Sequence, residues 1–115
     1  MLAFNAGYIQ GIKVRNGKIM ENLTQKISCA QLTVGFKRFF TAKDYNYTVD
    51  KVVCVPINSP VASCVFVEAR FFQGLGSDKP YIYKVVQEQE CFDRKPPYIQ
   101  LSLQKMNTEY DDERP

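Results

Sequence analysis

The chain has 115 residues and a formal net charge of +3, and 45% of its residues are hydrophobic and 23% charged. This composition is typical of one soluble globular domain whose core is large enough to form without disulfide staples. Its apolar runs span only a few residues, far short of the roughly 20 that a membrane-spanning helix needs, so no membrane contact is expected.

Strand-like segments follow one another along the whole chain. Val, Ile, Tyr, Phe and Thr are abundant, which favours β structure. Gly7 and Gly11 interrupt the first segment, where barrel strands place bulges or sharp bends. Asn16-Gly17 is a strong signal for a tight turn. The expected strands cover residues 4–14, 18–22, 26–36, 48–55, 65–72, 81–87 and 98–103.

The segment 65–72 alternates most informatively. One face carries Val65, Val67, Ala69 and Phe71, and the other carries Phe66, Glu68, Arg70 and Phe72. An aliphatic face of period two predicts a half-buried strand, and the Gly/Ser/Asp/Pro loop that follows predicts a hairpin with 81–87. Aromatic rings beside an arginine on the outer face suggest a platform for flat anionic ligands.

No segment shows sustained helical periodicity, although residues 58–63 have room for one helical turn. Short strands separated by turn signals predict an all-β barrel or sandwich. Residues 1–105 are the expected domain, and residues 106–115 form a short acidic tail with four acidic residues against Arg114. The body then holds 14 basic and 8 acidic residues, a balance that suits contact with polyanions.

Cys29, Cys54, Cys64 and Cys91 show no CxxC spacing, and no signal peptide is apparent at the N-terminus. Buried free thiols are therefore expected, in preference to a metal site or disulfides, and a cytoplasmic location is the default.

The chain contains no histidine, no P-loop and no GxGxxG motif. The commonest general base, the triads built on it and most zinc enzymes are therefore excluded. We expect no enzyme activity, no metal and no cofactor.

A binding surface is the remaining prediction, and residues 37–47 carry its densest signal. Lysines and arginines neutralise phosphates, and bases stack on aromatic rings without regard to sequence. The cluster consists of Lys37, Arg38, Phe39, Phe40, Lys43, Tyr45 and Tyr47. The alternative is that Phe39 and Phe40 belong to the core. Arg70 with Phe72, and Tyr81 or Tyr83 with Lys84, are further candidates, although either tyrosine could be a rim residue with a wet hydroxyl.

The order of these features resembles the single-stranded DNA-binding proteins of bacteria and their phages, which have the oligonucleotide/oligosaccharide-binding (OB) fold. The run Val65-Phe66-Val67-Glu68-Ala69-Arg70-Phe71 is similar to the family's V-x-V-E-G-R-L strand, with Ala69 where glycine is usual. Tyr81, Val85 and Val86 match the strand Y-x-x-E-V-V, with Lys84 where an acid is usual. Residues 30–38 match the second strand and its exit.

The resemblance implies a five-stranded Greek-key barrel with an extra C-terminal strand at 98–103. It implies a sequence-independent single-stranded DNA-binding protein, more like a phage-encoded member, that acts in DNA replication or recombination. Partners would be single-stranded DNA, further copies of the chain, with a dimer favoured, and replication or recombination proteins. The expected phosphate contacts are Lys13, Arg15, Lys37, Arg38, Lys43, Arg70 and Lys84, and the expected stacking rings are Phe39, Phe40, Tyr45, Tyr47, Phe72 and Tyr83.

A second hypothesis is a β-barrel interaction module that binds a host or replication protein. Exposed aromatics would then anchor the interface, and the basic residues would steer an acidic partner. This hypothesis predicts no salt-dependent affinity for oligonucleotides.

Overall fold

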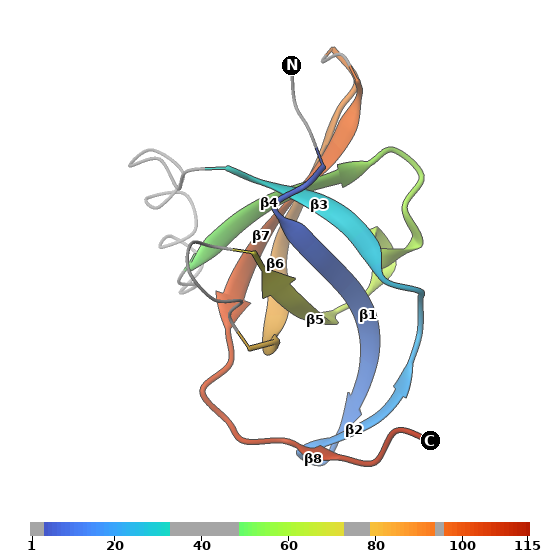
Figure 1. Cartoon of the computed structure of the whole chain (residues 1–115), viewed down its shortest axis with the longest axis vertical. Helices are drawn as coiled ribbons and strands as arrows, with labels where there is room; N and C mark the ends of the chain where they lie inside the picture. The colour runs from blue at the N-terminus through green and yellow to red at the C-terminus, as the bar shows by residue number, and fades with distance from the viewer. Residues whose placement is uncertain (1–3, 33–48, 73–78, 94–95) are drawn as a thin grey trace.

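A computed structural model describes residues 4–32, 49–72, 79–93 and 96–115 (Figure 1). The prediction of an all-β fold with little helix is confirmed. No helix among these residues is long and apolar enough to cross a bilayer. The strands are β1 (Gly7–Arg15), β2 (Lys18–Asn22), β3 (Ile27–Leu32), β4 (Lys51–Pro56), β5 (Phe66–Phe71), β6 (Tyr81–Cys91), β7 (Tyr98–Lys105) and β8 (Asp111–Asp112), and the 3-10 turn η1 spans Pro60–Ser63.

Six of these strands close into a barrel. The sheet runs in the order β3-β4-β7-β6-β5-β1, and pairing of β1 with β3 completes the ring. The extra C-terminal strand is part of the wall, because β7 pairs antiparallel with β4 on one side and β6 on the other. It therefore covers strand edges within its own barrel.

The two halves of strand β1 pair with different strands. Its first half, from Gly7, pairs with β3 and β5 inside the barrel wall, and its second half pairs with β2 as a hairpin. The predicted turn is confirmed, because Asn16 and Gly17 have φ of 53° and 74°. Two positive φ values in succession match the twist of a hairpin, and asparagine and glycine tolerate them best.

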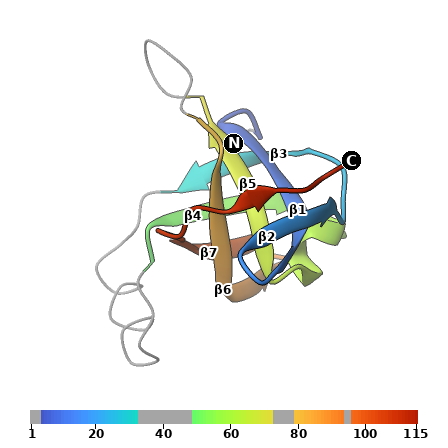
Figure 2. The ribbon, with the colours of Figure 1, turned by 90° about the horizontal axis from the view of Figure 1, so that it is seen from below.

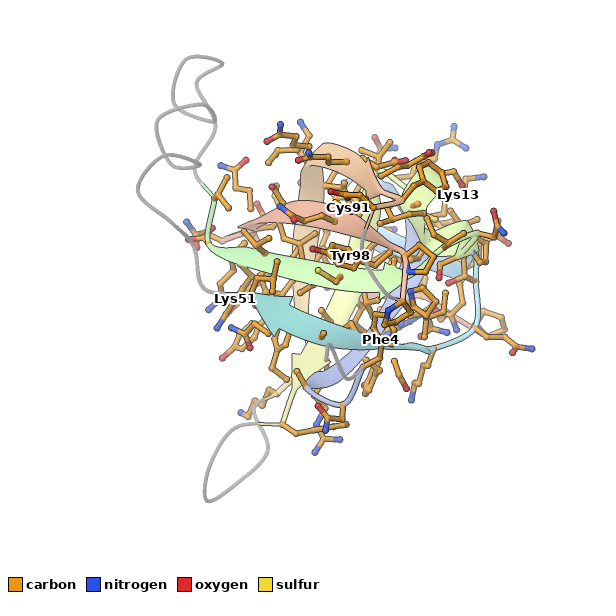
Figure 3. The ribbon with its side chains drawn as sticks, turned by 90° about the horizontal axis from the view of Figure 1, so that it is seen from above. Phe4, Lys13, Lys51, Cys91 and Tyr98 are labelled. Carbon is orange, nitrogen blue, oxygen red and sulfur yellow. The ribbon has the colours of Figure 1, made fainter. Side chains whose placement is uncertain are left out.

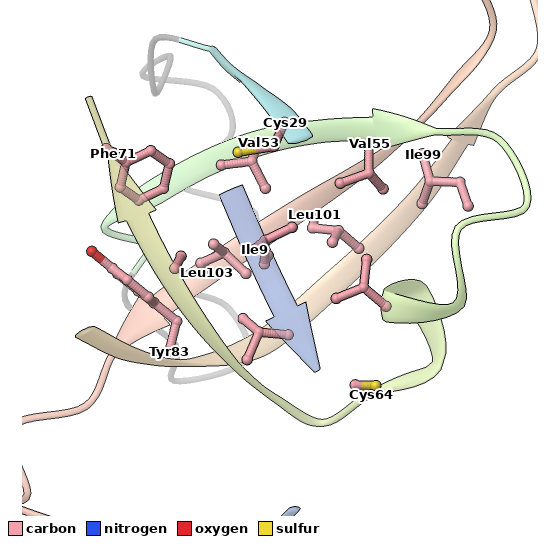
Figure 4. Close-up of a cluster of buried hydrophobic side chains, with 13 residues drawn as sticks. Ile9, Cys29, Val53, Val55, Cys64, Phe71, Tyr83, Ile99, Leu101 and Leu103 are labelled. Atoms are coloured by element: carbon pink, nitrogen blue, oxygen red, sulfur yellow. The ribbon is translucent and has the colours of Figure 1, made fainter. Parts of the chain in front are cut away.

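The core lies inside the barrel, on the face that the alternation predicted, except that Val65 precedes β5 and is 58% exposed. Val67, Ala69 and Phe71 of β5 are buried, and the inward residues of β4, β7 and β1 pack against them (Figure 4). Gly7 allows β1 to lie close to the end of β5. A Cβ at this position would overlap the carbonyl oxygen of Arg70 and lie 2.9 Å from the Cα of Phe71. The register of the pairing between β1 and β2 shifts between Lys13 and Val14, and not at Gly7 or Gly11, where a bulge was expected.

The thiols are free, as predicted. Cys29, Cys54 and Cys64 are buried and Cys91 is partly exposed. Burial raises the pKa of Cys29 to about 12, and the neighbouring Cys54 adds to the shift. A buried apolar setting keeps a thiol protonated and poorly reactive, so Cys29 behaves as a core residue.

The acidic tail folds back onto the barrel, a feature the sequence did not predict. β8 pairs parallel with β2, with Lys18 opposite Asp111 and Ile19 opposite Asp112. Figure 2 shows the tail running across the outside of the barrel over β5. The pairing of β8 with β2 therefore attaches the tail to the β2 edge of the domain.

Candidate nucleic-acid interface

One end of the barrel gathers aromatic rings and cations from β1, β4, β5, β6 and β7, together with Lys26, which precedes β3. Strands β1, β4 and β6 begin near this end, and strands β3, β5 and β7 finish there (Figure 1). We call it the basic–aromatic end. Its described members are Tyr8, Lys26, Lys51, Arg70, Phe71, Phe72, Tyr81 and Lys105.

On the outer wall, two rings and two cations form one continuous group. The rings of Tyr8 and Phe72 meet edge to face with centroids 6.4 Å apart. Lys26 Nζ lies 4.7 Å from the centroid of the Tyr8 ring, and Arg70 Cζ lies 5.9 Å from that of Phe72. Tyr8 and Arg70 are directly opposite on β1 and β5, so the sheet register holds the group together. Phe72 is 55% exposed, which leaves ring surface open to solvent.

On the rim of the barrel, two lysines lie over two further rings. Lys105 Nζ is 3.8 Å from the centroid of Tyr81, a ring that is 41% exposed. Lys51 Nζ is 5.3 Å from the centroid of Phe71, which is buried. The backbone amide of Lys105 donates to Asp50 Oδ2 at 2.7 Å, which fixes the end of β7 against the start of β4.

Tyr83 was predicted to stack on bases, and the structure shows that this was wrong. Its ring is only 3% exposed and packs edge to face on Phe71, with centroids 6.2 Å apart. Figure 4 shows both rings inside the barrel. Tyr81 and Tyr83 share the inward face of β6, opposite Ala69 and Val67. Because Tyr81 is the first residue of the strand, it reaches the rim, whereas Tyr83 lies one step deeper in the core.

The other predicted residues divide into three groups: those in the basic–aromatic end, those elsewhere on the described barrel, and those outside the described residues. Arg70 and Phe72 lie in the basic–aromatic end. Lys13 and Arg15 are exposed but sit at the far end of β1, and Figure 3 shows Lys13 and Lys51 on opposite sides of the barrel. Lys84 is half-buried on the outer face opposite Phe66, away from the rim. Lys37, Arg38, Phe39, Phe40, Lys43, Tyr45 and Tyr47 lie outside the described residues.

Sequence reasoning missed four members of the site. Tyr8 had a usable signal, because Ile9 beside it is apolar and period two then turns Tyr8 outward. Lys26, Lys51 and Lys105 lie near the ends of strands far apart in the sequence. Their proximity depends on the closure of the barrel, which no local pattern encodes.

Glu68 lies beside the site on the outer face of β5 and forms an ion pair with Arg114 of the tail. The guanidinium of Arg114 donates to both oxygens of Glu68, each at 3.0 Å, and to Asn22 Oδ1 at 3.1 Å. It also donates to Asp112 through Nε at 2.9 Å and Nη2 at 2.7 Å. The hydrogen bond to Asp112, and then that to Glu68, raise the pKa of Arg114. One guanidinium is thus shared between Asp112 of the tail and Glu68, which lies two residues from Arg70.

The described residues of the basic–aromatic end bring cations and ring faces together. Among residues 4–32, 49–72, 79–93 and 96–115, no three side chains of the metal-ligating types converge. The basic–aromatic end offers cations and ring faces, which together recognise flat anionic groups. No family model, curated protein or solved structure matches this chain.

Proposed function

We propose that the chain binds single-stranded DNA, without regard to sequence, through the basic–aromatic end. The observation that carries the proposal is the grouping of four cation–ring contacts, made by Lys26, Lys51, Arg70 and Lys105, at one end of the barrel. Rings supply stacking surfaces of about 1–3 kcal/mol per base, and cations neutralise the phosphates between bases.

The exposed rings define the entry point for bases. Phe72 and Tyr81 are the most open rings of the site, and they stand at the end of β5 and the start of β6. A strand of DNA that stacks on both would pass Arg70 and Lys105, which already lie over these rings.

The biological setting belongs to the same proposal. A small barrel offers a short footprint, so we propose that several copies coat the strand, with a dimer as the simplest closed unit. Coating of this kind serves DNA replication or recombination in the cytoplasm, and in a phage it would meet the host's replication or recombination proteins.

The test is fluorescence anisotropy with a labelled poly-thymine of about 30 nucleotides, with an equally long duplex as control. We expect tight binding to the single strand and weak binding to the duplex. If the four cations each contact one phosphate, log K should fall with log salt with a slope of about −3.

The competing hypothesis is a module that binds an acidic protein through the same rings. It predicts no salt-dependent affinity for either oligonucleotide. Absence of binding at low salt, or equal binding to strand and duplex, would reject the single-strand proposal and leave the protein-binding module in its place.

A further inference from the structure

A second binding surface lies near η1, at the end of the barrel away from the basic–aromatic end. A groove of about 340 Å³ separates η1 and the residues before it from the far half of the β6–β7 hairpin. Ile57, Ala62, Phe92 and Ile99 give it apolar walls. Phe92 is 66% exposed, the largest exposed fraction among the large apolar side chains that the structure describes. A groove of this kind is a docking surface for an apolar chain segment.

The strand beside the groove has an open edge. β6 pairs with β5 only from Tyr81 to Lys84, whereas its pairing with β7 continues to Cys91. From Gln87 onward, the side of β6 that faces away from β7 has no strand partner among the described residues. Unpaired backbone donors and acceptors on such an edge are a template for an added strand.

Two carboxylates set the charge of the groove. Glu88 lies opposite Leu101 and Glu90 opposite Ile99, and both glutamates line the groove together with Ile99. Both are exposed, and no described residue forms an ion pair with either. A complementary ligand must therefore present cations and apolar groups in alternation.

We propose that this groove binds an extended segment of a partner protein in which basic and apolar residues alternate. The segment would add as a strand to the open edge of β6 at residues 87–91. Because alternate side chains of an added strand point to one face, its basic side chains would all face the groove, where their aliphatic stems would lie beside Ile57 and Phe92. Its lysines or arginines would pair with Glu88 and Glu90. DNA is not the ligand here, because the two carboxylates repel phosphate.

The proposal does not depend on DNA binding, because it uses different residues of opposite charge. Its test is the anisotropy of a labelled peptide of about eight residues in which lysine and valine alternate. We expect saturable binding, and no binding of the matching glutamate–valine peptide. The double variant Glu88→Gln/Glu90→Gln should weaken binding about tenfold.

The matched control is Glu21→Gln/Glu109→Gln, which removes the same charge from exposed positions outside the groove. It should bind the peptide as the unaltered protein does. Backbone amide shifts in NMR spectra should change at residues 87–91 and at Ala62. A lysine–valine peptide with alternate N-methylated residues should lose binding, because it cannot complete the strand pairing.

Three outcomes would overturn the proposal. The first is an equal loss of affinity in both double variants, and the second is a set of shifted amides remote from β6 and η1. The third is self-association in sedimentation that the Glu88→Gln/Glu90→Gln variant abolishes, which would assign the groove to a second copy of the chain.

Discussion

Arg114 and Glu68, 46 positions apart in the sequence, form a two-pronged pair in which two guanidinium nitrogens each donate to a different carboxylate oxygen at 3.0 Å. The side chains are 17% and 12% exposed, so the pair is partly desolvated. This contact attaches the end of the chain to the outer face of β5.

Replacing Arg114 with alanine should lower the free energy of unfolding by about 1–3 kcal/mol. The reason is that the partly buried Glu68 carboxylate loses both hydrogen bonds from Arg114. Urea unfolding with an unchanged m-value measures the loss. Lys18→Ala is the matched control, because Lys18 and Glu113 pair at 3.6 Å while about half exposed. It should cost no more than about 0.5 kcal/mol. Equal losses in the two variants would contradict the importance of the Arg114–Glu68 pair.

The attachment of the tail should weaken in acid. The side-chain hydrogen bond from Arg114, then its backbone amide bond, lower the pKa of Asp112 from 3.8 to about 2. A carboxyl whose pKa is lower in the folded state stabilises above the unfolded pKa, and this contribution disappears as the pH falls through the folded pKa. The stabilisation from Asp112 should be complete above about pH 4 to 5 and lost toward pH 2.

An NMR titration of the Asp112 carboxyl carbon checks this expectation. In the Arg114→Ala variant the titration midpoint of Asp112 should rise toward 3.8, since the side-chain hydrogen bond from Arg114, the largest cause of the lowered pKa, is lost. A midpoint that stays near 2 in the variant would assign the low pKa to another group.

Gly7→Ala should destabilise the barrel more than Gly11→Ala. The new methyl group at position 7 would meet the backbone at Arg70 and Phe71, which cannot move without shifting β5. At position 11 it would meet the side chains of Cys64 and Thr24, with Thr24 Cγ2 at 3.1 Å. We expect a loss of about 3 kcal/mol at Gly7 and about 1 kcal/mol at Gly11.

A double-mutant cycle tests whether the sulfur of Cys64 causes the loss of stability in Gly11→Ala. Gly11→Ala should cost less in a Cys64→Ala background, because the obstructing sulfur is gone. Unfolding by urea gives all four free energies. Additive effects of the two substitutions would show that the sulfur is not the obstacle.

Phe72→Ala should weaken single-strand binding about 5- to 150-fold, since one stacked base is worth about 1–3 kcal/mol. Leu23→Ala is the matched control, because Leu23 is 51% exposed and lies outside the site.

Arg70→Gln should also weaken binding and reduce the salt slope by about 1, whereas Arg15→Gln at the far end of β1 should do neither. Anisotropy at two salt concentrations measures all four variants. Equal effects of Arg70→Gln and Arg15→Gln would place the interface elsewhere.

The sequence determined the order of strands β1 to β7, the first turn and the inward face of β5 from Val67 to Phe71. Local steric preference fixes Asn16-Gly17 in a turn, and period two places Val67, Ala69 and Phe71 on one side of any strand. Such signals need only neighbouring residues. They also predicted the free buried thiols and the short helical turn near residues 60–63.

The tertiary structure decided which strand ends meet and how far each side chain lies from the rim. Alternation placed Tyr81 and Tyr83 on one face, but only the closed barrel makes one a surface ring and the other a core ring. Lys51 and Lys105 come together because β4 and β7 pair, and Arg114 reaches Glu68 because β8 joins β2. These contacts join residues that are distant in the chain, so they depend on the packing of the whole barrel rather than on local preference.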